Sequence, residues 1–263
     1  LFNTLLFMIE KKLAFPFRVE PFQEDYTGRL SWSNLGNQIL RASSLHAEAH
    51  GFGHTYMKEH RQGWVLARLI LEVSALPRTG DDYAIATWVK RIFGQFTDRL
   101  YTISGADGRI YGHGTSTWAL IDYATRQPVN LETLPDGGFT HVVLPEEVPV
   151  ARPSRGRCVA AEPVLKHTAV YSDLDINGHV NSIRYIDMVL DTFPKAWHDR
   201  HRVERIEMSY GLEGYCGDRF HIFRDALSER QFAVRIVRPA ADGSETIIAR
   251  SIVTFAPMDE EQQ

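Results

Sequence analysis

The chain has 263 residues and a net charge of −4, with 44% hydrophobic and 24% charged residues. This composition is typical of a globular protein and excludes a disordered or collagen-like chain. An acidic chain lacks the positive field that holds nucleic acid, and no apolar run approaches the roughly 18–20 residues of a membrane-spanning helix. We therefore expect neither nucleic-acid binding nor a membrane span.

The N-terminal segment and the cysteines give no sign of export. Glu10, Lys11 and Lys12 interrupt the apolar first 17 residues, no positive region precedes these residues, and no small-residue cleavage site follows them. Cys158 and Cys216 are too few for a disulfide framework or a Cys-rich zinc site. A cytoplasmic protein is the expectation.

The first half of the chain predicts one helix followed by antiparallel strands. A helical pattern covers Leu35–Ala49, after a turn rich in Asp and Gly. Runs rich in β-branched and aromatic residues follow, and the last two flank Ala106-Asp107-Gly108 as the strands of a hairpin do. The expected strands are 64–74, 83–91, 100–104 and 109–122.

The second half predicts the same order of elements after a proline-rich stretch, 145–157, which is the expected linker. Val180, Ile183 and Ile186 recur at helical spacing in a predicted helix over 180–193. Strand-like runs cover 164–171, 232–238 and 246–255. One helix and several antiparallel strands, present twice, indicate the α+β class, with a curved sheet wrapped around a helix in each copy.

The two halves also repeat short motifs. The turn at 25–28 matches the turn at 175–178 at an offset of 150, and 106–108 matches 241–243 at an offset of 135. Self-similarity in the same order along the chain predicts a duplicated module. The expected domains are an N-terminal module at 1–144, a linker at 145–157 and a C-terminal module at 158–263.

The densest polar cluster lies at 171–181, before the helix expected near Val180. Asp175, Asn177 and His179 could surround an attacked carbonyl, and backbone N–H groups of Gly178 and Val180 at a helix start could hold the oxyanion. The alternative is an Asx-rich turn that only caps the helix, with His179 packed against it. The residues of this segment leave both readings open.

The segment SDLDINGHVNSIRYI, residues 172–186, resembles the Asp-Leu-Asp-x-Asn-x-His-Val-Asn signature of plant and bacterial acyl-acyl carrier protein (acyl-ACP) thioesterases. IEMSYGLEGYCGD, residues 206–218, resembles the second motif of that family, with Glu213 after Tyr210. The resemblance runs from about Phe17 to Phe255. It implies a double hotdog fold and hydrolysis of a fatty acyl-ACP thioester to a free fatty acid.

By position, the resemblance makes Asp175, Asn177, His179 and Glu213 the catalytic residues. We expect Glu213 or Asp175 to be the general base for water, with a covalent acyl-carboxylate intermediate as the rival mechanism. Neither mechanism requires a metal or a cofactor. Plant members carry a cysteine after the glutamate, whereas this chain has Gly214, so a cysteine nucleophile is not expected.

In the first module the matching turn carries Thr27 and Arg29 in place of Asn177 and His179. This substitution predicts a module that has lost catalysis and shapes the acyl pocket. The alternative is that Arg29 is a surface cation and the neighbouring apolar side chains are ordinary core. The candidate pocket residues are Leu35, Ile39, Leu40, Trp64, Leu66 and Trp88.

Other sequence features support weaker alternatives. His46, His50 and His54 have a spacing that could bind a metal, although a solvated or capping role is the expectation. The linker arginines could dock the acidic acyl carrier protein or could be solvated loop charges; they are Arg152, Arg155 and Arg157. A non-catalytic acyl-binding protein, an acyl-CoA thioesterase and a hotdog dehydratase remain alternatives, and the chain could be a monomer or a homodimer.

Overall fold

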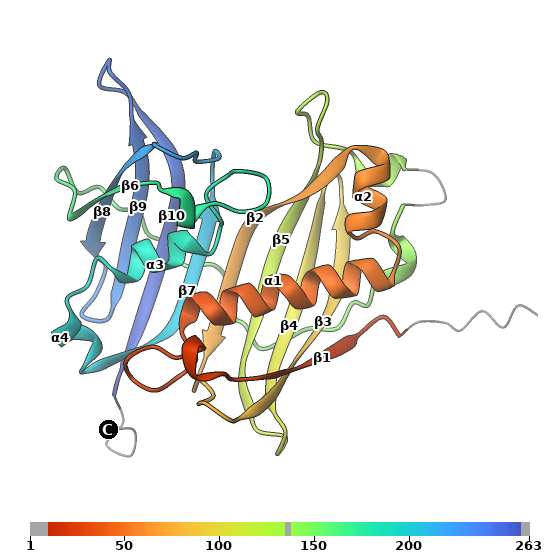
Figure 1. The fold of residues 1–263 in the computed structure, drawn as a ribbon, viewed down its shortest axis with the longest axis horizontal. Coiled ribbons are helices and arrows are strands. Elements are labelled where there is room, and N and C mark those ends of the chain that lie inside the picture. Colours follow the sequence, from red (N-terminus) through yellow and green to blue (C-terminus); the bar gives the residue numbers. More distant parts are fainter. Residues whose placement is uncertain (1–9, 135–137, 259–263) are drawn as a thin grey trace, which may run out of the picture.

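The computed structural model describes residues 10–134 and 138–258. One ten-stranded sheet runs through the molecule in the order β1-β3-β4-β5-β2-β7-β10-β9-β8-β6, and its paired strands are antiparallel (Figure 1). The order places the first five strands in one half of the sheet and the last five in the other. The two halves therefore meet at a single strand pair, β2 with β7.

The N-terminal half carries the longest helix. Helix α1, Trp32–Ala49, begins where the Ser31 hydroxyl accepts the N–H of Asn34, three residues before the predicted start. It lies across the sheet, and the second helix lies beyond its C-terminal end (Figure 1). The elements of this half are β1 Leu13–Arg18, α1, α2 His54–His60, β2 Gln62–Val73, β3 Asp82–Phe93, β4 Phe96–Gly105 and β5 Ile110–Asp122, with short 3₁₀ turns at Leu131–Thr133 and Thr140–Val142.

The C-terminal half has a much shorter helix than the sequence predicts. Helix α3 covers only Arg184–Leu190, because the N–H of Val180 donates to the Gly214 carbonyl and the segment before Arg184 is held in a loop. The predicted helix over 180–193 is therefore wrong at both ends. The elements of this half are β6 Leu165–Thr168, α3, α4 Lys195–His198, β7 His201–Tyr210, β8 Arg219–Ala226, β9 Gln231–Pro239 and β10 Glu245–Pro257.

A local two-fold axis relates the halves at the β2–β7 seam. Leu71 pairs with Ile206, which is its own counterpart at the offset of 135, while Ile70 pairs with Glu207 and Glu72 pairs with Arg205. Such an exchange of partners is the signature of a two-fold interface, here within one chain. The Arg205 guanidinium also contacts the Glu72 carboxylate, so a charged pair joins the halves.

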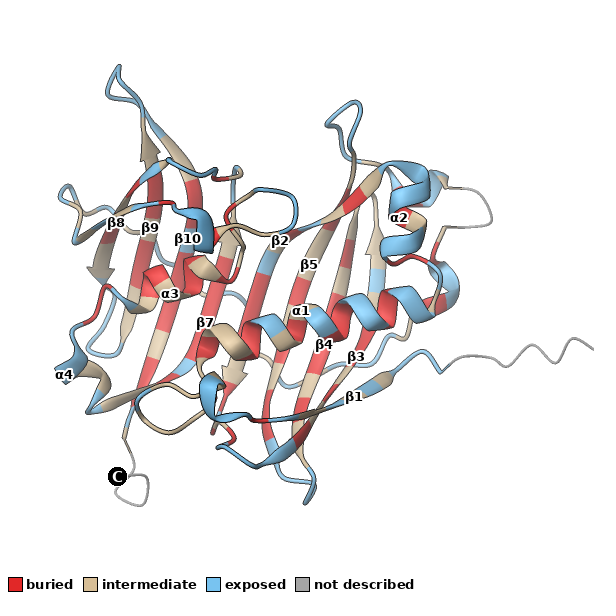
Figure 2. Cartoon of the chain, in the orientation of Figure 1, coloured by how far each residue is buried: buried red, intermediate tan, exposed pale blue. Residues whose placement is uncertain are grey.

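One hydrophobic core continues across the seam beneath α1 and α3 (Figure 2). Leu35 and Ile39 of α1 are fully buried there, as are Ile186 of α3 and Ile206 of β7. The helices pack closely, since a Cβ added at Gly36 would lie 2.8 Å from Cδ1 of Ile183. Among the described residues, no helix is both long and apolar enough to cross a membrane.

The predicted linker crosses the opposite face of the sheet. All residues of 145–157 are described, and they form no helix or strand. Ser154 donates both its N–H and its hydroxyl to Glu207, and the Trp88 indole donates to the Glu146 carbonyl over 3.4 Å. The linker therefore covers the outer side of the seam, away from α1.

Candidate active site

The polar cluster predicted from the sequence forms a tight loop after β6. The Asp175 carboxylate accepts the N–H of Asn177 at 2.8 Å and the N–H of His179 at 3.2 Å. Gly178 has a φ of 77°, a left-handed conformation that glycine adopts without steric cost. Asp175 therefore holds the shape of the loop, and Asn177 lies on its exposed side.

The loop brings His179 against Glu213, which lies beyond β7. The Nδ1 atom of His179 is 3.6 Å from Oε1 of Glu213, slightly beyond hydrogen-bond range, and both side chains are about one quarter exposed at 24% and 28%. The bond from the Val180 N–H to the Gly214 carbonyl fixes the two segments together. The imidazole also meets the Tyr215 ring edge to face, with centroids 5.2 Å apart.

The other oxygen of the Glu213 carboxylate has two further partners. Tyr215 donates its hydroxyl to Oε2 over 2.9 Å, and the Arg126 guanidinium lies 2.5 Å from the same atom. The hydrogen bond to Glu213 raises the pKa of the Tyr215 phenol, so the phenol keeps its proton and stays a donor. Oε1 is thus the oxygen that faces His179.

Arg126 and Tyr215 are residues of this site that the sequence analysis missed. Arg126 belongs to the turn after β5 in the N-terminal half, and it has a φ of 59°, which is uncommon for a residue with a side chain. Asp122 holds the turn by accepting the N–H groups of Ala124 and Thr125. Only the fold shows that this turn reaches Glu213.

The two backbone groups expected to form an oxyanion hole are already bonded within the site. The N–H of Gly178 donates to the Asp175 carbonyl over 3.0 Å, and the N–H of Val180 donates to the Gly214 carbonyl over 2.8 Å. The helix whose start they were expected to form begins four residues after Val180. In this structure neither Gly178 nor Val180 has a free N–H for an oxyanion, which corrects the prediction.

The candidate acyl-pocket residues do not share one surface. Leu35, Ile39 and Leu66 are buried in the core beneath α1, with Leu40 packed against it. Trp64 packs in a second cluster with Phe52 and Phe139, apart from that core. Trp88 lies on the outer face under the linker, where Lys12 stacks on its ring at 4.1 Å, so it does not lie with the candidates beneath α1.

The histidines of α1 are more buried than expected. His46 is fully buried and donates from Nε2 to the Lys11 carbonyl, while His50 donates from Nδ1 to the His46 carbonyl. Burial lowers the pKa of His46 to about 3, so this imidazole is neutral at pH 7. A solvated role is therefore wrong for His46.

Comparisons with known proteins agree with the motifs. The acyl-ACP thioesterase N-terminal domain matches residues 10–133, and the acyl-ACP thioesterase C-terminal domain matches residues 159–254. Oleoyl-acyl carrier protein thioesterase 1, a chloroplastic protein of Arabidopsis thaliana, is 29% identical over 198 residues, which cover 68% of this chain and 54% of that protein. The chain spans about half the length of the curated relatives it matches.

Solved structures cover the chain more completely. A crystal structure of an acyl-ACP thioesterase from Bacteroides thetaiotaomicron is 39% identical, with a TM-score of 0.86 and coverage of 94% of this chain and 98% of that chain. The 12:0-ACP thioesterase from Umbellularia californica shares the fold at 20% identity, with a TM-score of 0.80 and the same coverage of both chains. The predicted double hotdog fold is confirmed, and the chain belongs to the acyl-ACP thioesterase family.

Proposed function

We propose that this protein hydrolyses the thioester of a fatty acyl-ACP and releases a free fatty acid. The observation that carries the proposal is the approach of His179 to Glu213 at 3.6 Å, in a loop that bears the family motif. A thioester carbonyl is already reactive, so a base for water and a positioned dipole are sufficient for hydrolysis. The assignments of Asp175, Asn177, His179 and Glu213 belong to this proposal.

In the proposed mechanism, Oε1 of Glu213 takes a proton from a water molecule. The oxygen of that water forms a bond to the thioester carbon, and the tetrahedral intermediate collapses as the carbon–sulfur bond breaks. The pantetheine sulfur takes up the proton, which leaves a carboxylic acid and a free thiol. His179 orients the water, and Asn177 donates to the carbonyl oxygen from the exposed side of the loop.

Arg126 and Asp175 position the reacting groups in this mechanism. The Arg126 guanidinium and the Tyr215 hydroxyl both hold Oε2, so Oε1 is presented toward the imidazole. Asp175 bonds the N–H of His179 and thereby fixes the backbone that carries the imidazole. Asp175 is thus occupied as an acceptor, which favours Glu213 as the base.

The separate roles of the two halves are also part of the proposal. Residues 158–263 would carry the chemistry, residues 1–144 would shelter the acyl chain near Leu35, Ile39 and Leu66, and 145–157 would join them. The linker arginines Arg152, Arg155 and Arg157 are exposed and would attract an acidic carrier protein. We place the protein in the cytoplasm, as a monomer or a homodimer.

The test is an assay of thiol release. Purified protein is incubated with acyl-ACPs of several chain lengths and with the matching acyl-CoAs, and free thiol is followed with a chromogenic reagent. The proposal predicts release from at least one acyl-ACP at a rate that exceeds the rate with the matching acyl-CoA. An absence of release from every acyl-ACP would contradict hydrolysis and would favour a non-catalytic acyl-binding protein.

A further inference from the structure

The two-fold repeat gives the candidate active site a counterpart in the N-terminal half. The N–H of Leu30 donates to the Pro77 carbonyl, as the N–H of Val180 donates to the Gly214 carbonyl. The residue before each donor and the residue before each acceptor therefore correspond between the two halves. Arg29 stands where the other half has His179, and Leu76 stands where it has Glu213.

The counterpart has the same loop but lacks the histidine and the glutamate. The N–H of Gly28 donates to the Asp25 carbonyl over 3.0 Å, as the N–H of Gly178 donates to the Asp175 carbonyl. Thr27 takes the place of Asn177 and bonds back to Asp25 with both its N–H and its hydroxyl. With Leu76 in place of the glutamate and Arg29 in place of the histidine, the position lacks the carboxylate–imidazole pair of the other half.

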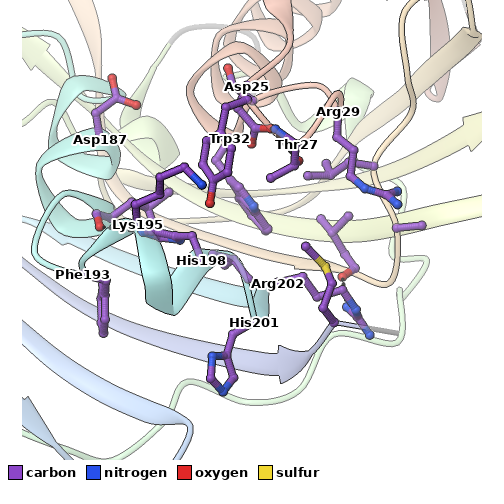
Figure 3. Close-up of a pocket in the computed structure, with 18 of the residues that line it drawn as sticks. Asp25, Thr27, Arg29, Trp32, Asp187, Phe193, Lys195, His198, His201 and Arg202 are labelled. Atoms are coloured by element: carbon purple, nitrogen blue, oxygen red, sulfur yellow. Dashed lines mark hydrogen bonds between the residues drawn. The ribbon is translucent and has the colours of Figure 1, made fainter. Parts of the chain in front are cut away.

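A cavity of about 460 Å³ opens at this position (Figure 3). This volume lies within the range of sites for small-molecule ligands, which is roughly 300–1,000 Å³. Its walls are formed by the loop at 25–31 with the start of α1, by α3, α4 and the segment between them, by the start of β7 and by the loop after β2. Much of its lining is apolar and includes Trp32, Leu76, Leu190, Phe193, Val203 and Met258.

Arg29, Lys195 and Arg202 are the lysine and arginine side chains that line the cavity (Figure 3). Lys195 is paired with Asp199, and Arg202 is paired with Glu204. Burial lowers the pKa of the Arg29 guanidinium, and the charges of Arg78, Arg109 and Arg202 lower it further, while Asp25 raises it.

Three carboxylates also line the cavity, those of Asp25, Asp187 and Asp191. Asp25 is bonded to the backbone and hydroxyl of Thr27, and Asp187 is paired with Arg184 at 2.5 Å. Within the described part of the chain, the Arg29 side chain has no hydrogen bond or ion pair with a carboxylate. A guanidinium that adjoins an apolar cavity is suited to a carboxylate attached to a hydrocarbon chain.

We propose that this cavity is a second, non-catalytic binding site for a fatty carboxylate, with the carboxylate on Arg29 and the chain against Leu76, Leu190 and Phe193. The site is separate from the proposed active site. The identity of the ligand as the reaction product rests on the proposed function, but binding itself does not require hydrolysis.

The test is equilibrium dialysis of dodecanoate, below its micelle concentration, against the whole chain and three variants. Arg29→Glu reverses the charge, Leu76→Glu places a carboxylate in the cavity wall, and Arg230→Glu is a matched control on the exposed β8–β9 turn. We expect Arg29→Glu and Leu76→Glu each to weaken one class of sites by at least ~10-fold, a change of roughly 1.4 kcal/mol in binding free energy. Arg230→Glu should bind as the unmodified chain does.

Two further ligands test whether binding requires the carboxylate group and whether other anions compete for the site. Dodecanol should bind equally well to the unmodified chain and to Arg29→Glu. Coenzyme A, whose phosphates could also bind arginine, should not displace dodecanoate from this class of sites. Equal dodecanoate binding by all four proteins, or displacement by coenzyme A, would overturn the proposal. Arg29→Glu should still release thiol from acyl-ACP, so a failure of this proposal is distinguishable from a failure of the proposed function.

Discussion

The Arg126 guanidinium of the N-terminal half lies 2.5 Å from the Glu213 carboxylate of the C-terminal half. The proposed active site is therefore completed by a turn from the other half of the chain. This contact gives Oε2 of Glu213 a charged partner and leaves Oε1 toward His179, which lies 3.6 Å away. Both halves must be docked for Glu213 to have this orientation.

Replacement of Arg126 by glycine should separate the effect of its charge on catalysis from the effect of its backbone conformation on stability. Glycine adopts the φ of 59° more easily than arginine, so the midpoint of thermal unfolding should stay the same or rise. The loss of one charge-assisted hydrogen bond to Glu213 should lower kcat by roughly 10-fold, with KM for an acyl-pantetheine nearly unchanged. Steady-state kinetics and a melting curve measure both effects.

Arg61→Gly is the matched control for this variant. Arg61 also has a positive φ, of 55°, and it is an exposed arginine at the end of α2. It should gain the same backbone benefit with no effect on kcat. If both variants lowered kcat equally, a positioning role for Arg126 would be wrong.

The site has no room for the cysteine that plant members carry after the glutamate. A Cβ added at Gly214 would lie 2.5 Å from the Tyr185 hydroxyl and 2.7 Å from Cζ of Phe220. Gly214→Cys should therefore destabilise the protein by about 1–3 kcal/mol, the usual cost of overpacking, and should not raise kcat. Chemical denaturation and the thiol-release assay measure the two effects.

The two native cysteines should be dispensable for hydrolysis. Cys216 is exposed, and burial raises the pKa of the Cys158 thiol, which keeps it protonated and a poor nucleophile. Cys158→Ala and Cys216→Ala should each keep most of the activity. A loss of more than about 100-fold in either folded variant would instead indicate a thiol nucleophile, because one catalytic acid–base group contributes ~10²–10⁴-fold.

The linker arginines offer a test of carrier-protein docking. Their backbone is anchored, since Arg205 donates to the carbonyls of Ala151 and Arg152, while the side chains of Arg155 and Arg157 are exposed. Arg155→Glu combined with Arg157→Glu should raise KM for acyl-ACP and leave acyl-pantetheine kinetics nearly unchanged. An equal effect on both substrates, or none on either, would remove the docking proposal.

Buried His46 predicts a pH dependence of stability. Its pKa is about 3 in the folded protein against an ordinary value of 6.5, so between these values the unfolded chain binds more protons. Stability should therefore fall as the pH drops below 6.5, by about 2 kcal/mol between pH 7 and pH 5. His46→Gln should remove this part of the slope in urea unfolding, whereas His60→Gln, at an exposed position, should retain it.

The sequence predicted the repeat and seven of the ten strands, because both depend on local patterns, but it did not predict β1, β7 or β8. The Ala-Asp-Gly turns at 106–108 and 241–243 close β4–β5 and β9–β10 as expected. The long helix of the second half was predicted wrongly, since apolar spacing at Val180 and Ile183 does not reveal that the Val180 N–H bonds to Gly214. A tertiary hydrogen bond overrode the helical period there.

The candidate site was predictable only in part. Motifs predicted the loop at 175–179 and the segment around Glu213, and the structure brings His179 and Glu213 together. Arg126 lies 87 residues before Glu213 in a turn with no motif of its own, so only the fold reveals it. The sequence also does not show which face of the sheet the linker covers, and Trp88 lies on that face.

The most direct test compares His179→Ala with Arg29→Ala, two substitutions at corresponding positions of the repeated loop. We expect His179→Ala to lower kcat for acyl-ACP hydrolysis by roughly 100-fold or more, the scale of losing one acid–base group, and Arg29→Ala to change it only a few-fold. Circular dichroism should show both variants folded. If Arg29→Ala abolished turnover while His179→Ala kept it, the active site would lie in the N-terminal half and the account would be contradicted.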